Sequence, residues 1–172
     1  MANRIGYSQA ELERIQAFWN LRFPPDLVEL LKEHRPLLDG PASFDWLQTA
    51  TIPERLDWPF ESFWYDVAHN DVWWPEWGER PSHFEERKER LKEIFAEAPR
   101  LIPLYSHRYI PQEPCESGNP VFSVYQTDVI CYGVNLQDWI ERERGGWGAK
   151  PWQRIKEIRF WSEALRKNNA EP

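Results

Sequence analysis

The stretch from Leu101 to Gly133 constrains the fold more than any other part of the chain. It is rich in β-branched and aromatic residues, which suit a pleated, half-buried surface. Two turn signals divide it. The polar loop 112–119 runs into a proline that can open a strand, and 126–128 contains an aspartate that can bond to its own backbone. These features predict an antiparallel sheet of about four strands.

Helical signals lie on both sides of this stretch. Ser8 and Glu11 form a capping box that predicts a first helix, and Pro25 predicts the start of a second one that runs through about His34. The pattern predicts an α+β fold, a small antiparallel sheet of about four strands flanked by N- and C-terminal helices, in one domain covering residues 1–172. The remaining predicted helices cover 43–50 with Phe44 and Leu47 inward, 85–98, 135–144 and a last segment that begins at Pro151.

Residues 53–79 concentrate both charge and aromatic rings. They hold seven acidic residues against one arginine, and eight aromatic residues, so nearly all of the net charge of −7 lies in this segment. The apolar spacing around Phe63 fits a helix and a strand equally well. The conformation of 58–70 therefore stays open at this point.

Charge and hydropathy exclude several classes of partner. A net charge of −7 and an isoelectric point near 5.2 argue against non-specific nucleic-acid binding and against an anionic membrane surface. No apolar run approaches the ~20 residues that span a bilayer. The first residues show no secretory signal, so we expect a cytoplasmic protein in which Cys115 and Cys131 are free thiols.

The polar residues of the central stretch are interpreted as structural. A triad of Ser123, His107 and Asp128 can be drawn, but Ser123 lies inside a strand pattern and not on a nucleophile elbow. His107 and Arg108 interrupt an apolar run, and an unpaired buried charge is costly. We therefore predict a structural contact of Arg108 or His107 with Asp128, and no catalytic residue.

The histidines and cysteines show no spacing typical of a metal site. We therefore expect neither a metal nor a cofactor. The four histidines are His34, His69, His83 and His107.

The tryptophan-rich segment 73–81 is the strongest functional candidate. Three tryptophans in five residues can form a wall of the core, or they can form a protein-recognition surface with the acidic residues around them. An acidic surround would steer a basic partner. The candidate partner contacts are Glu54, Glu61, Trp73, Trp74, Glu76, Trp77, Glu79 and Arg80.

Three runs of this chain resemble the SUKH superfamily, which includes bacterial toxin-immunity proteins and the yeast cell-wall assembly regulator. LIPLYSHRYIP (101–111) and GNPVFSVYQTDVICYG (118–133) resemble the family signature, and WWPEWGERP (73–81) resembles its tryptophan-rich segment. Together they span about a third of the chain, in the family's order. One departure is Cys131, where an aromatic residue is expected.

The resemblance implies an α+β fold with a binding role and no catalytic centre. The leading hypothesis is a single SUKH-like, non-enzymatic domain that neutralises a cognate toxin by direct binding, with a basic toxin domain as the partner favoured by the acidic segment. The alternatives are a regulatory scaffold or adaptor, and an enzyme of unknown class. The oligomeric state is left open.

Overall fold

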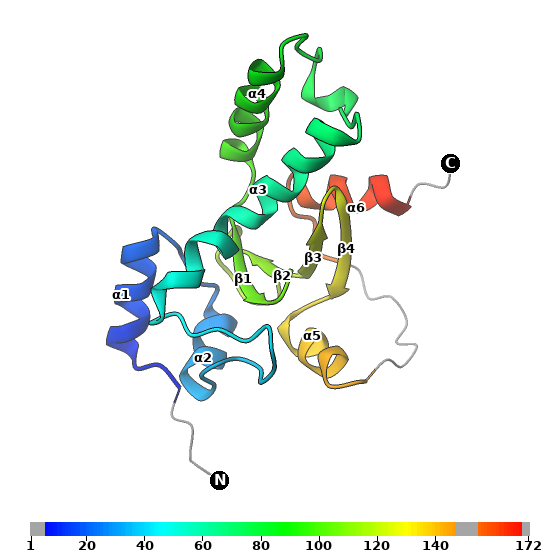
Figure 1. The fold of residues 1–172 in the computed structure, drawn as a ribbon. Helices are drawn as coiled ribbons and strands as arrows, with labels where there is room; N and C mark the ends of the chain where they lie inside the picture. Colours follow the sequence, from blue (N-terminus) through cyan, green and yellow to red (C-terminus); the bar gives the residue numbers. More distant parts are fainter. Residues whose placement is uncertain (1–5, 147–154, 170–172) are drawn as a thin grey trace.

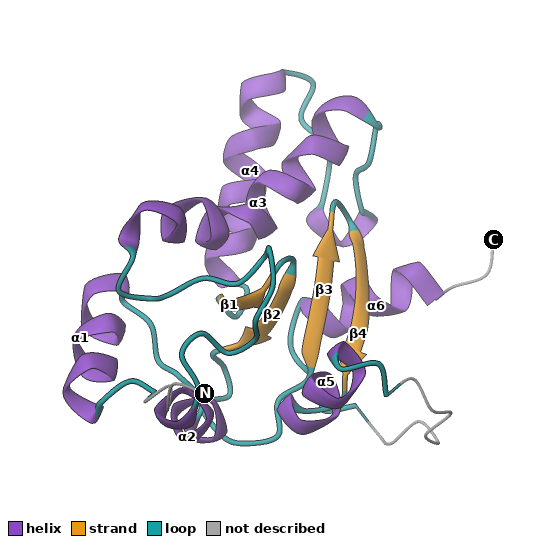
Figure 2. Ribbon diagram, turned by 60° about the horizontal axis from the view of Figure 1, so that its bottom comes forward, coloured by secondary structure: helices purple, strands orange, loops and turns teal. Residues whose placement is uncertain are grey.

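The computed structural model describes residues 6–146 and 155–169 and shows a four-stranded antiparallel sheet among helices (Figures 1 and 2). The strands pair in chain order, so the sheet is a simple meander. The predicted α+β fold is confirmed. The strands are β1 (Leu101–Tyr105), β2 (Arg108–Pro111), β3 (Val121–Tyr125) and β4 (Asp128–Gly133).

Two tight turns set the register of the sheet. Ser106 and Gln126 each adopt a positive φ, near +48° and +57°, in the turns that join β1 to β2 and β3 to β4. Arg108 then lies opposite Ser123, and Ser123 lies opposite Ile130. The turn predicted at 126–128 is present, although Asp128 already belongs to β4.

Most of the predicted helices are present, and side-chain caps explain where α1 (Gln9–Trp19) and α5 (Leu136–Glu143) begin. Ser8 Oγ accepts a hydrogen bond from the Glu11 N–H at 3.3 Å, and the Glu11 carboxylate accepts one from the Ser8 N–H at 2.7 Å. Asn135 Oδ1 likewise accepts from the Asp138 N–H at 2.9 Å. The predicted helices that the structure contains are α1 (Gln9–Trp19), α2 (Pro25–Glu33), α4 (Phe84–Glu97) and α5 (Leu136–Glu143).

The segment 58–70, left open by its spacing, is helical. It belongs to α3 (Ile52–His69), which has a proline in its first turn and another, Pro59, in its interior. Figure 1 shows α3 and α4 side by side, projecting together beyond the sheet. In the described parts of the chain, no helix is long and apolar enough to cross a membrane.

The helix predicted over 43–50 is wrong. The chain there is irregular up to the short 3₁₀ helix η1 (Thr49–Thr51), Leu47 is exposed, and the buried side chain is Trp46. The physical reason is Asp45, whose carboxylate accepts hydrogen bonds from the Leu47 N–H, the Tyr7 hydroxyl and Arg35. A side chain that binds nearby backbone groups competes with helix formation.

The last helix begins later than predicted. Pro151 lies outside the described residues, 155–158 has no regular structure, and α6 covers Trp161–Asn169. Phe160 adopts a φ of +67°, and Ser162 Oγ accepts a hydrogen bond from the Ile158 N–H at 2.8 Å. This bond joins the segment before the helix to its first turn, and the positive φ of Phe160 interrupts helical geometry just before Trp161.

Helices cover both faces of the sheet, which is why all of β3 except Tyr125 is buried. Val121 joins a core cluster with residues of α1, α2 and α5, whereas Phe122 and Val124 join a second cluster with residues of α3, α4 and α6. This alternation follows from the period of two along a strand. Cys115 and Cys131 are both free, as predicted.

Candidate functional site

The tryptophan-rich segment mainly packs against the buried side of α3. Trp77 is only 4% exposed, and its ring lies 4.6 Å from that of Trp74 and 6.5 Å from that of Phe63. Trp73 is half-buried and donates its indole N–H to the Gly78 carbonyl at 2.9 Å. Trp77 is therefore a core residue, and its assignment as a partner contact is corrected.

Two charged residues of this segment already have partners within the chain. Lys167 Nζ lies 2.7 Å from a carboxylate oxygen of Glu76, and its hydrogen bond holds the pKa of that carboxyl below its usual value. Arg80 pairs with Asp71. Glu79 is exposed. The acidic character of the segment is thus partly neutralised where the tryptophans lie.

The opposite side of α3 carries a different set of residues. Successive helical residues are about 100° apart, so Glu54, Trp58, Glu61 and Tyr65 fall within one narrow stripe while Phe63 points the other way. Glu54 and Glu61 are exposed, and Tyr65 is 47% exposed. The two predicted contacts Glu54 and Glu61 are therefore separated from the tryptophan-rich segment by the helix itself.

The β3–β4 hairpin extends this stripe. Trp58 donates its indole N–H to the Val124 carbonyl at 2.9 Å, and its ring lies 5.9 Å from that of Tyr125, which is 54% exposed. Ser62 and Asp66 fix the hairpin to α3, because the Asp66 carboxylate accepts from the Thr127 N–H and Ser62 Oγ from the Gln126 N–H. We call the surface formed by Glu54, Trp58, Glu61, Tyr65 and Tyr125 the aromatic–acidic face.

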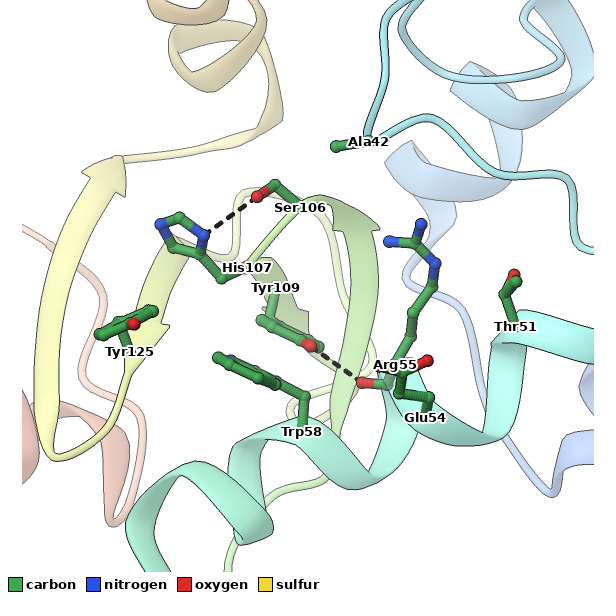
Figure 3. A pocket seen from close by; sticks show the side chains of 9 residues that line it. All are labelled: Ala42, Thr51, Glu54, Arg55, Trp58, Ser106, His107, Tyr109 and Tyr125. Carbon is green, nitrogen blue, oxygen red and sulfur yellow. Dashed lines mark hydrogen bonds between the residues drawn. The ribbon is translucent and has the colours of Figure 1, made fainter. Parts of the chain in front are cut away.

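A pocket of about 340 Å³ opens at the α3 N-terminal end of this face (Figure 3). Its walls come from α3, from the β1–β2 and β3–β4 hairpins and from the loop before α3, so residues far apart in the sequence meet there. It is lined by Ala42, Thr51, Glu54, Arg55, Trp58, Ser106, His107, Tyr109 and Tyr125.

A proline inside α3 helps to build this pocket. Pro59 has no N–H, so the carbonyl of Arg55, four residues earlier, lacks its helical donor. The hydroxyl of Tyr109 donates to that carbonyl at 2.8 Å instead (Figure 3). Burial raises the pKa of the Tyr109 hydroxyl far above its usual value, so it stays protonated and remains a donor. This bond ties β2 to the first turns of α3.

His107 lines the pocket from the β1–β2 turn. Its Nδ1 lies 3.0 Å from Ser106 Oγ, and the edge of its ring faces Tyr125 at 5.9 Å between centroids. Burial lowers the pKa of the imidazole, and the neighbouring Arg108 guanidinium adds to the effect. His107 is therefore mostly neutral at pH 7, so one of its ring nitrogens donates a hydrogen bond and the other accepts one.

Arg108 pairs with Glu143, which corrects the partner predicted for it. Its Nε lies 3.0 Å from Glu143 Oε1, its Nη1 donates to Ser123 Oγ at 3.0 Å, and it lies 3.7 Å above the ring of Tyr132. Asp128 instead accepts a hydrogen bond from Asn168. The strand register explains why Arg108 does not pair with Asp128. Arg108 lies opposite Ser123 on β3, and Ser123 lies opposite Ile130 on β4, which is two residues away from Asp128. The Ser–His–Asp triad considered from the sequence (Ser123, His107 and Asp128) is not assembled in the described structure.

Sequence reasoning missed Arg55, Trp58, Tyr109 and Tyr125. The signal that could have found part of this site is the spacing of residues 54, 58, 61 and 65, which share a face only if the segment is a helix. On a strand the first two would face away from the last two. Because the helix and strand interpretations stayed balanced, the face could not be recognised.

We predict that the purified protein carries no stoichiometric metal. Within the described residues, no three His, Cys, Asp or Glu side chains are grouped so that they could hold an ion. Elemental analysis after purification without chelator should show less than about 0.1 zinc per chain, and a chelator should leave the thermal unfolding midpoint unchanged. One zinc per chain together with unfolding by the chelator would contradict this.

Comparison with known proteins gave no match to a family model, a curated protein or a solved structure. The SUKH resemblance therefore stays a prediction from the sequence.

Proposed function

We propose that this chain is a non-enzymatic protein-binding domain of SUKH type, and within that class an immunity protein that neutralises a cognate toxin by direct binding. The observation that carries the proposal is the aromatic–acidic face beside its pocket. It presents partly exposed Trp58, Tyr65 and Tyr125 together with exposed carboxylates.

The composition of this face matches the anatomy of a protein interface. Tyrosine and tryptophan are enriched among the residues that dominate binding energy, and charged groups at the rim set association rate and partner choice. Glu54 and Glu61 give the face a negative field that favours a basic partner. The toxin expected here is therefore a protein with a basic docking surface.

The pocket groups also support binding over catalysis. In the described structure the contacts of His107 are Ser106, the Val124 N–H on its carbonyl and the ring of Tyr125. The Glu143 carboxylate acts on His107 electrostatically, but it is paired with Arg108 and is not among these contacts, so it does not orient the imidazole as a general base. The proposal accordingly assigns no catalytic residue.

The test is the salt dependence of association with a candidate toxin, for example the product of an adjacent toxin gene. The Debye length falls about threefold between ~0.05 M and ~0.5 M salt, and we expect the association rate to fall at least about tenfold. The double variant Glu54→Gln/Glu61→Gln should associate more slowly at low salt and lose most of this dependence. Stopped-flow fluorescence measures both. Trp58→Ala or Tyr125→Ala should mainly raise the dissociation rate.

Two further double variants make the result specific. Glu13→Gln/Glu33→Gln removes the same charge from α1 and α2 and should leave the salt dependence close to that of the wild type. Glu76→Gln/Glu79→Gln tests the tryptophan-rich segment separately. If only this last variant slows association, the partner docks on residues 73–81 and the proposed face is wrong. If the wild-type rate does not change with salt, acidic steering is wrong for both surfaces.

A further inference from the structure

Arg55 is a cation in the wall of the pocket that forms no ion pair with a described residue, although the Glu54 carboxylate lines the same pocket. Its side chain is half-buried, and its guanidinium lies 4.5 Å from the centre of the Phe44 ring, which holds the group in place. Its Nε is buried and has no hydrogen-bond partner. In the part of the chain that the structure describes, no carboxylate forms an ion pair with it.

Such an arrangement is unusual because a guanidinium donor is costly to bury unsatisfied, and here Nε is buried without a partner. Figure 3 shows Arg55 extending from α3 toward the loop that carries Ala42, on the side of the pocket that faces Ser106. A guanidinium that is already oriented by stacking loses little further freedom on binding and fits a carboxylate through two parallel hydrogen bonds.

Most of the remaining groups of the pocket suit the rest of a carboxylate side chain; the exception is Glu54, whose carboxylate lines the pocket and belongs to the aromatic–acidic face. The rings of Trp58, Tyr109 and Tyr125 offer apolar surface for its methylene groups, and the hydroxyl of Thr51 offers a further donor. The acidic residues of the aromatic–acidic face would repel a free small anion, but they attract a basic protein surface that carries one acidic residue within it.

We infer that this pocket receives a single aspartate or glutamate side chain of the protein partner, with its carboxylate on Arg55. The inference rests on the proposed function and adds a specificity element to it. A cognate partner presents one acidic residue surrounded by basic ones, whereas a uniformly basic surface leaves Arg55 opposed to a like charge. Such a mismatch penalises wrong partners.

The experiment compares two capped tripeptides, acetyl-Lys-Glu-Lys-amide and acetyl-Lys-Gln-Lys-amide. Non-specific attraction to an acidic face favours the second, because it carries one more net positive charge. The pocket favours the glutamate peptide, which we expect to bind about fivefold more tightly than the glutamine peptide. This difference is near the upper end of the contribution of a partly exposed ion pair. The readout is the NMR signal of the Trp58 indole N–H, identified with Trp58→Phe.

Arg55→Met keeps the apolar stem over Phe44 and should abolish the preference or reverse it, while Arg55→Lys should retain part of it. Arg14→Met removes a positive charge from the exposed surface of α1 and should leave the preference unchanged. The inference is overturned if the wild type binds the glutamine peptide as tightly as the glutamate peptide, if neither peptide produces a saturable shift, or if the preference persists in Arg55→Met.

The wild-type comparison requires no variant to fold, and none of these titrations uses the toxin. A negative peptide titration therefore contradicts only the assignment of Arg55, whereas a failed salt-dependence test contradicts the proposed docking face. When the toxin complex is in hand, Arg55→Met should weaken it at least about thirtyfold, as expected for an arginine at the centre of an interface. An affinity within about threefold of the wild type would also overturn the assignment.

Discussion

Replacing Phe122 with alanine should lower the free energy of unfolding by about 3–5 kcal/mol. The side chain is 0% exposed and lies in the sheet between Tyr109 on β2 and Cys131 on β4. Its ring lies 6.5 Å from that of Trp161 on α6. Removing it leaves a cavity between the sheet and the helices that cover it, where close packing prevents full relaxation. Urea unfolding measures the change.

Phe18→Ala is the matched control, because the same side chain is 71% exposed at the end of α1. It should cost less than about 1 kcal/mol, as surface substitutions usually do. Equal losses for the two variants would show that Phe122 does not have the core role assigned to it.

Glu143→Ala should cost about 3 kcal/mol, the second large effect that we expect. Glu143 and Arg108 are 14% and 13% exposed, and the carboxylate also accepts from the Trp139 indole N–H at 3.2 Å. The alanine variant leaves Arg108 with its Ser123 and Tyr132 contacts but no described counter-charge. An uncompensated charge in a largely buried position is strongly destabilising.

Two comparisons separate this explanation from a simple loss of side-chain atoms. Glu89→Ala removes one partner of the exposed Lys92–Glu89 pair on α4 and should cost less than about 1 kcal/mol. The double variant Arg108→Met/Glu143→Leu should recover most of the loss, because both charges are removed together. If the double variant is as unstable as the single one, packing around Glu143 and not its charge explains the loss.

Local chemistry made a large part of the fold predictable. The capping box at Ser8 and the cap at Asn135 act within a few residues, so their helices could be placed from the chain alone. The strands around Val121 and the turn after Tyr125 likewise follow from side-chain type and turn residues. Where a distant partner intervened, prediction failed, as at Asp45, which binds Tyr7 from 38 residues earlier.

The candidate site was less predictable than the fold. Glu54 and Glu61 were chosen for the charge of their segment, and the structure leaves both exposed. Trp77 was chosen for its type, which cannot distinguish a core wall from a docking surface, and it is buried. The partner of Arg108 was sought within the sheet, but it came from α5, 35 residues further along the chain.

The central sheet, several helix starts and the concentration of negative charge in 53–79 could be read from the chain alone, because each depends on residues close together in the sequence. The folded arrangement was needed to show that α3 is helical throughout and that it separates the tryptophans from the carboxylates of Glu54 and Glu61. The same holds for the pocket in which Arg55, Tyr109 and Tyr125 meet. The physical reason is that burial and pairing depend on which distant segments pack together, and the spacing of residues along the chain does not contain this information.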